Sequence, residues 1–92
     1  MNSEQLQALV LDVVAEVAPE ADLGSIDPDI SFHDQFEIDS VDYLNIMMTL
    51  EARLGLLIPE ADYPKLSSLQ GCVHYLQPKL AEKAGQAAED SP

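Results

Sequence analysis

Basic residues are scarce in this 92-residue chain. It holds four Lys and Arg residues against 17 Asp and Glu residues, which gives a formal net charge of −13 at pH 7. A protein that binds nucleic acid needs a basic face to neutralise phosphates. Twelve of the acidic residues and none of the basic ones lie in residues 1–52. The composition therefore excludes nucleic acid as an expected partner and favours positively charged partners.

The chain also lacks a cysteine pair and long apolar runs. Cys72 is the single cysteine, so no intramolecular disulfide can form and nothing indicates an oxidising compartment. No apolar run approaches the roughly 20 residues of a membrane span, and no targeting segment is recognisable at the start. The 47% hydrophobic content suits one small globular domain without a large enclosed active site. We therefore expect a monomeric, cytoplasmic protein with no membrane span.

A first helix is predicted over residues 3–18, because apolar residues recur there at spacings of three and four. Asn2 or Ser3 can cap its N-terminus, and Gln5 is placed to complete a capping box with Asn2. Residues 20–39 are then predicted to form a long acidic loop that apolar side chains hold against the core. Loops of this length in compact domains are usually functional or disordered, and the apolar residues favour the first option. These residues are Leu23, Ile26, Ile30, Phe32, Phe36 and Ile38.

A second helix is predicted from Ser40, which is of an N-cap residue type, to about Leu54. The apolar arc of this helix is wide. Either all of it is buried, or a part such as Val41 and Met48 faces solvent or a partner. Residues 59–64, bounded by two prolines, have room for one helical turn.

A last helix is predicted to open at Ser67, with Gln70 as its capping-box partner, and to end at Pro78. The residues beyond this proline have little to bury. We therefore predict a folded domain over residues 1–78 and a mobile tail over residues 79–92.

Residues that commonly carry catalysis or bind metals are few. His33, His74 and Cys72 supply the only imidazole and thiol groups, fewer than the four ligands of a structural zinc site. The acidic loop does not match a calcium-binding loop, and no glycine-rich phosphate loop or nucleophile elbow is present. We expect no catalytic residue and no metal site.

The sequence around Ser40 resembles the acyl carrier proteins. The Asp-Ser-Val run at residues 39–41 is the centre of a resemblance that covers roughly residues 5–77. It implies an all-α, acyl-carrier-like four-helix bundle, with three main helices, one short helix and a long loop between the first two. The other matching positions are Ile26, Pro28, Asp29, Phe32, Leu50-Glu51, Gly55, Ile58-Pro59 and Val73-His74-Tyr75.

The resemblance implies that the protein is a carrier and not an enzyme. Ser40 would receive 4′-phosphopantetheine from coenzyme A through a phosphopantetheinyl transferase. Acyl intermediates of fatty-acid, polyketide or specialised lipid biosynthesis would then be held there as thioesters. A helix N-terminus suits this position, because its unpaired N–H groups and positive dipole end favour a phosphodiester. Simple N-capping by Ser40 is the other interpretation, and the two are compatible.

The resemblance also implies a docking surface and an acyl cavity. The implied partners are acyl ligases, ketosynthases, acyltransferases and related enzymes with basic docking patches. The implied docking residues are Asp39, Val41, Asp42, Met48 and Glu51. The cavity candidates are Phe32, Leu50, Ile58, Tyr63, Leu66, Cys72 and Leu76. A merely solvated face and ordinary core packing are the respective alternatives.

Six positions depart from the family pattern. Glu37 and Ile38 replace the small Gly-Ala pair common before the Asp-Ser run, which favours a different loop conformation there. Asn45 and Ala52 replace typical acids on the docking helix, so the usual fatty-acid synthase partners are less certain. Tyr63 and Cys72 are bulkier than the alanines common in the cavity, which predicts a smaller cavity or a short or polar cargo left outside it. Two other functions stay open: an aminoacyl or peptidyl carrier, and an acidic helical adaptor without a prosthetic group.

Overall fold

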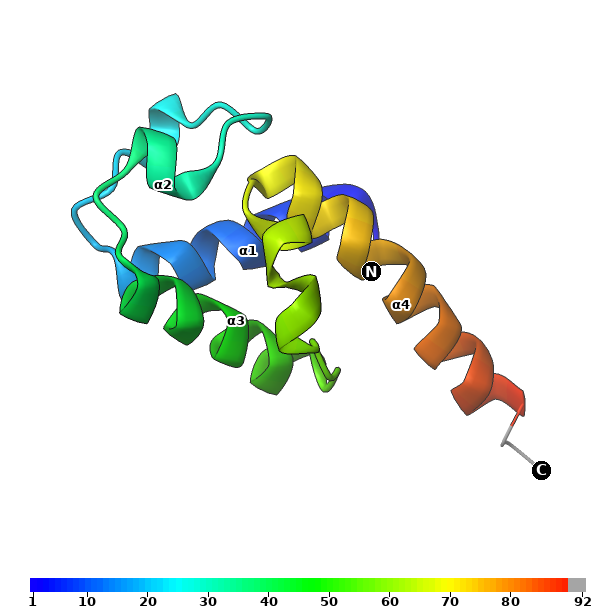
Figure 1. Cartoon of the computed structure of the whole chain (residues 1–92). Helices are drawn as coiled ribbons and strands as arrows, with labels where there is room; N and C mark the ends of the chain where they lie inside the picture. Colours follow the sequence, from blue (N-terminus) through cyan, green and yellow to red (C-terminus); the bar gives the residue numbers. More distant parts are fainter. Residues whose placement is uncertain (90–92) are drawn as a thin grey trace.

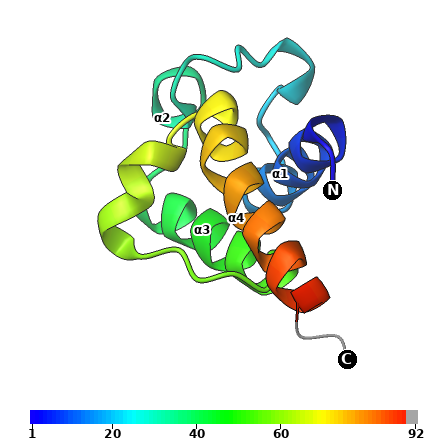
Figure 2. The same cartoon turned by 90° about the vertical axis from the view of Figure 1, so that its right-hand side faces the viewer.

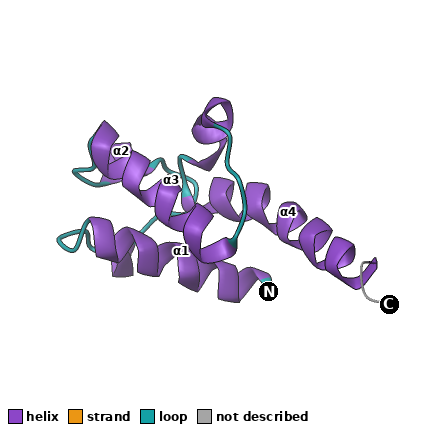
Figure 3. Cartoon of the chain, turned by 90° about the horizontal axis from the view of Figure 1, so that it is seen from below, coloured by secondary structure: helices purple, strands orange, loops and turns teal. Residues whose placement is uncertain are grey.

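The structure is a computed structural model that describes residues 1–89. Helices joined by loops form it (Figure 1). None of these residues forms a strand (Figure 3), so the predicted all-α class is confirmed. Among them there is also no helix with the length and hydropathy needed to cross a membrane. The α-helices and the 3₁₀ helices η1 and η2 follow in the order α1 (Ser3–Val17), η1 (Leu23–Ser25), α2 (Phe32–Gln35), α3 (Ser40–Leu54), η2 (Glu60–Leu66) and α4 (Leu69–Glu89).

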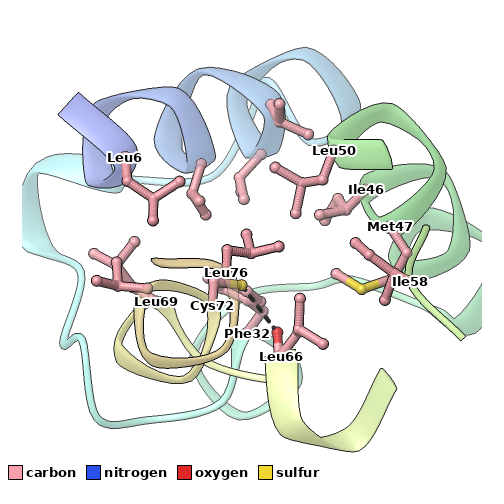
Figure 4. Close-up of a cluster of buried hydrophobic side chains, with 14 of the residues drawn as sticks. Leu6, Phe32, Ile46, Met47, Leu50, Ile58, Leu66, Leu69, Cys72 and Leu76 are labelled. Atoms are coloured by element: carbon pink, nitrogen blue, oxygen red, sulfur yellow. Dashed lines mark hydrogen bonds between the residues drawn. The ribbon is translucent and has the colours of Figure 1, made fainter. Parts of the chain in front are cut away.

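The core lies where α1 packs against both α3 and α4, with η2 packed against α4 (Figures 1 and 2). Figure 4 shows apolar side chains from these four elements pointing toward one another. No charged or polar side chain is buried among the described residues, so the interior is held together by apolar packing. Its fully buried members include Leu6, Val10, Val13, Val14, Phe32, Ile46, Met47, Leu50, Leu66, Cys72 and Leu76.

The N-terminal caps confirm one prediction and correct another. At α1, Asn2 Oδ1 accepts the Gln5 N–H at 2.8 Å and Gln5 Oε1 accepts the Asn2 N–H at 2.9 Å, which is the predicted capping box. At α4 the cap is Ser68, whose Oγ accepts the Gly71 N–H at 3.0 Å. The prediction of Ser67 as the cap is wrong, because Ser67 is the C-cap that follows η2.

The helix end predicted at Pro78 is also wrong, because α4 continues to Glu89. The proline removes one N–H and leaves the carbonyl of His74 without its helical partner, but both residues are exposed, so water can satisfy that carbonyl. Beyond the proline, Lys83 Nζ donates to the Leu54 carbonyl at 3.0 Å and caps the end of α3. The mobility of residues 79–92 stays a prediction, and residues 90–92 lie outside the described residues.

The long connection between α1 and α3 is held against the core as predicted, with one exception. Phe32 and Ile38 are buried, and three more apolar residues of the loop pack against the core, but Ile30 is 42% exposed. Gln35 Oε1 accepts the N–H of Asp27 at 2.9 Å. Gln35 Nε2 donates to the backbone carbonyls of Asp27 at 2.8 Å and of Ile30 at 2.9 Å. These bonds fix the segment that leads into α3.

Gly71 allows the start of α4 to approach η2 closely, and this contact yields a stability prediction. A Cβ at Gly71 would overlap the backbone carbonyl oxygen of Lys65. We expect Gly71→Ala to lower the free energy of unfolding by about 1–3 kcal/mol, measured by urea denaturation. Gly24→Ala is the matched control, since its Cβ would lie an ordinary 3.5 Å from Asp22 Oδ1. Equal stabilities of the two variants would contradict the close contact.

Candidate functional site

The first turn of α3 is capped by Asp39 and Asp42. Asp39 Oδ1 accepts the Asp42 N–H at 2.8 Å, and Asp42 Oδ2 accepts the Asp39 N–H at 3.4 Å. The prediction that Ser40 caps this helix is therefore wrong, because Ser40 is its first helical residue. An aspartate precedes Ser40 and takes the cap position, so the serine hydroxyl is not needed to begin the helix.

The Ser40 side chain is exposed, and its hydroxyl forms no hydrogen bond with any described residue. The N–H groups of Ser40 and Val41 belong to the first turn, where no carbonyl of the helix can accept them. The hydroxyl thus lies beside free backbone donors at the positive end of a 15-residue helix. This arrangement can hold a phosphate ester, so the residues present fit the group that the sequence predicts.

Two hollows flank the start of α3. One, with a volume of about 460 Å³, lies between α3 and η2 and is lined by Ser40 itself together with Tyr43, Leu44 and Tyr63. The other, of about 680 Å³, is larger and is lined by acidic residues such as Glu20, Asp22, Glu37 and Asp42, but not by Ser40. Of these two hollows, the smaller one has Ser40 in its lining. We call it the serine groove.

The serine groove contains an aromatic contact that the sequence did not predict. The Tyr43 hydroxyl donates a hydrogen bond to the Tyr63 backbone carbonyl, and the two rings meet edge to face with centroids 6.3 Å apart. His33 also packs against Tyr43, with ring centroids 5.0 Å apart. Burial raises the pKa of Tyr43 above its ordinary value, so its hydroxyl remains a donor through the neutral range. One signal was available, because Tyr43 follows Ser40 by three residues and shares its helix face.

The predicted docking residues differ in their exposure and in their position on α3. Val41 and Met48 are 65% and 56% exposed, so the wide apolar arc does face solvent in part. Leu44, which the sequence did not single out, is 43% exposed and extends this apolar surface. Asp39 and Asp42 lie at one end of it as the helix cap, while Glu51 is half-buried. Asn45 and Ala52, where acids are typical, are also exposed.

The structure brings together six of the seven cavity candidates in the core and places the seventh at its edge. Tyr63 is half-buried and lines the serine groove. The Cys72 thiol is fully buried and donates to the Leu66 carbonyl at 3.2 Å. Burial raises the pKa of this thiol to about 12. Phe32, Leu50, Ile58, Leu66, Cys72 and Leu76 are the six buried residues, and Figure 4 labels all of them.

Comparison with known proteins assigns the family. Residues 8–76 match the family model described as a phosphopantetheine attachment site. The chain is 32% identical over 82 residues to a polyketide-8 synthase acyl carrier protein 2 of Streptomyces avermitilis, covering 89% of this chain and 88% of that protein. The chain belongs to the acyl carrier protein family. It is accordingly a carrier and not an enzyme, and the cofactor of its phosphopantetheine-binding domain is covalently attached 4′-phosphopantetheine.

Two further acyl carrier proteins show how widely this family is used. A meromycolate extension acyl carrier protein of Mycobacterium leprae is 32% identical over 89 residues, covering 97% of this chain and 76% of that protein. An acyl carrier protein of Lactobacillus johnsonii is 29% identical over 77 residues, covering 84% of this chain and 95% of that one. The relatives therefore include carriers named for different products.

Among the described residues of this carrier, no three His, Cys, Asp or Glu side chains group as metal ligands.

Two substitutions of Asp39 distinguish the contribution of its capping hydrogen bond from the contribution of its negative charge to the stability of α3. Asp39→Ala removes the acceptor for the Asp42 N–H, and we expect it to lower the free energy of unfolding by about 1 kcal/mol. Asp39→Asn keeps an oxygen acceptor and should remain within a few tenths of a kcal/mol of the wild type. Thermal unfolding followed by circular dichroism measures both variants. If both lost the same stability, the cap would depend on the charge of Asp39 and not on its hydrogen bond.

Proposed function

We propose that this carrier holds acyl intermediates on a 4′-phosphopantetheine arm attached to Ser40 and presents them to partner enzymes of fatty-acid, polyketide or specialised lipid biosynthesis. The observation that carries the proposal is the exposed Ser40 hydroxyl, which makes no hydrogen bond to the described residues because Asp39 caps the helix. When bound, the arm supplies a terminal thiol that forms thioesters with acyl groups. The chain's own residues supply attachment, orientation and docking.

Attachment at Ser40 is a phosphoryl transfer for which the chain provides only the nucleophile. The Ser40 oxygen forms a bond to the phosphorus of coenzyme A that bears the pantetheine, and the pyrophosphate bond breaks. The adenosine 3′,5′-bisphosphate part leaves, and the serine proton passes to a base of the transferase. The N–H groups of Ser40 and Val41 offset part of the negative charge that remains on the ester.

The surface of α3 supports docking on basic partner enzymes. Val41, Leu44 and Met48 provide exposed apolar contacts, and Asp39 and Asp42 place negative charge beside Ser40. Charge attraction of this kind speeds encounter with partners such as a phosphopantetheinyl transferase, ketosynthases, acyltransferases and acyl ligases, and salt weakens it. We place the carrier in the cytoplasm as a monomer, which leaves this end of α3 free for such partners.

The buried state of Cys72 makes the attachment directly measurable through thiols. At pH 8 a thiol with a pKa of about 12 has roughly a thousandfold less thiolate than an ordinary cysteine, and its burial also blocks reagents. We expect the native chain to show no rapidly reacting thiol before incubation with coenzyme A and a phosphopantetheinyl transferase, and one afterwards. In denaturant, where Cys72 becomes accessible, we expect one reactive thiol before this incubation and two after it.

Serine substitutions test which hydroxyl is used. Ser40→Ala should gain neither a fast thiol nor the mass of one phosphopantetheine group. Ser31→Ala is the matched control, because Ser31 also begins a helical turn but its Oγ accepts the Asp34 N–H at 3.2 Å. It should be modified like the wild type. The proposal fails if the wild type gains no mass, which would favour an adaptor without a prosthetic group, or if Ser40→Ala is modified normally.

A further inference from the structure

The serine groove begins at the residue proposed to carry the arm. Ser40 lines this groove, and so do Tyr43 and Leu44 on the next turn of α3. The opposite wall comes from η2, through Glu60 and Tyr63. A group attached to Ser40 therefore starts at an open groove whose lining is largely apolar and aromatic and includes the carboxylate of Glu60. Reaching the core from this groove requires passing between α3 and η2.

The passage between α3 and η2 is closed by Tyr43 and Tyr63. The Tyr43 hydroxyl bonds the Tyr63 backbone carbonyl, and the two rings pack edge to face across the boundary. His33 also packs against the Tyr43 ring, so residues of α2, α3 and η2 all take part in this contact. Burial keeps the Tyr43 hydroxyl protonated, because it raises the pKa of that group. The hydrogen bond therefore persists at neutral and mildly alkaline pH.

The helix η2 is also held from its other side, so it cannot move away from α3 freely. The Tyr75 hydroxyl of α4 donates to Asp62 Oδ2 at 2.6 Å, while the ion pair of Lys65 Nζ with Asp62 Oδ1, at 3.3 Å, lies within η2 itself. At the end of η2, the Ser67 carbonyl accepts the Phe32 N–H at 2.8 Å. Opening the passage would break contacts to α2, α3 and α4 together.

Behind this closure the space is filled by side chains of the chain itself. Leu50, Leu66 and Leu76 are fully buried, and the Cys72 thiol is fixed by its bond to the Leu66 carbonyl (Figure 4). An acyl chain that entered here would have to displace close-packed side chains, which costs free energy. An acyl chain is therefore accommodated at a lower free-energy cost in the serine groove than in the core.

We propose that Tyr43 and Tyr63 determine cargo specificity by closing the core, so that the acyl group lies in the serine groove. This inference rests on the proposed attachment at Ser40. The groove suits short or aromatic acyl groups with polar substituents, because aromatic rings line it and Glu60 and His33 offer hydrogen-bonding groups. Long aliphatic chains would remain partly exposed to water.

The test loads four chains with butyryl, benzoyl and decanoyl phosphopantetheine, using the corresponding coenzyme A thioesters and a phosphopantetheinyl transferase. The chains are the wild type, Tyr43→Phe, Tyr63→Ala and Tyr63→Phe. Intact mass reports loading, so a failure of attachment, which would contradict the proposed function, is distinguished from a wrong location of the cargo. Methyl and amide NMR shifts relative to the unacylated carrier then report where the cargo lies.

In the wild type, we expect benzoyl and butyryl groups to shift signals of Leu44 and Tyr63, while a decanoyl group leaves the methyl signals of Leu50, Leu66 and Leu76 in place. Tyr63→Phe should behave likewise, since the Tyr63 backbone carbonyl, and not its hydroxyl, closes the passage. Tyr43→Phe and Tyr63→Ala should let the decanoyl chain reach the core, so that the core methyl signals shift relative to the same variant without cargo.

Two results would overturn the inference. One is a decanoyl wild type whose core methyl signals shift as much as those of Tyr63→Ala. The other is a loaded benzoyl group that shifts no groove signal in the wild type. Because Tyr43→Phe removes a single oxygen atom from a half-buried ring, it keeps the test decisive even if Tyr63→Ala does not fold.

Discussion

The reciprocal hydrogen bonds between Asp39 and Asp42 are the constraint on which the site depends. A helix must satisfy the N–H groups of its first turn, and a serine at the cap would use its own hydroxyl for this. Here the preceding aspartate does so at 2.8 Å, and Ser40 becomes the first helical residue with an exposed hydroxyl. The same two carboxylates place negative charge on both sides of the serine. In the proposed function, helix stability, modification of Ser40 and attraction of partners therefore all depend on this one pair of residues.

The rest of the chain holds this turn in place. Core packing of α1 against α3 and α4 fixes the direction of α3. Lys83 of α4 caps the C-terminal end of α3 by donating to the Leu54 carbonyl. The Gln35 side chain fixes the loop that enters α3 by bonding backbone groups of Asp27 and Ile30. On the remaining side, η2 lies against Tyr43. Each element that surrounds Ser40 is thus tied to another element by named hydrogen bonds, and the serine itself is left free.

Sequence patterns predicted much of this architecture, because periodic burial and capping are local. The helix over residues 3–18 and its Asn2–Gln5 capping box follow from spacing alone. Three local predictions were wrong. In two of them, neighbouring residues could each cap the helix, and in the third, water can satisfy the backbone carbonyl that a proline leaves without its helical partner. Asp39 displaced Ser40 as a cap, Ser68 displaced Ser67, and Pro78 stayed within an exposed helix.

The candidate site was predictable in its centre and not in its walls. The family resemblance points to Ser40, whereas the wide apolar arc of the helix left open the exposure of Val41 and Met48 that the structure shows. The contact between Tyr43 and Tyr63 spans 20 residues of sequence, and its hydrogen bond uses a backbone carbonyl, which no residue pattern reveals. Family comparison likewise identifies the carrier and its cofactor but not the cargo, since its relatives carry names from several pathways.

The most direct measurement is the location of the modification within the chain. The wild type would be incubated with coenzyme A and a phosphopantetheinyl transferase, digested, and fragmented in a mass spectrometer that resolves each of its serines. We expect a single phosphopantetheine group, on Ser40. Modification of a serine that caps a helix, such as Ser31 or Ser68, would contradict the claim that the free hydroxyl at the start of α3 determines the site.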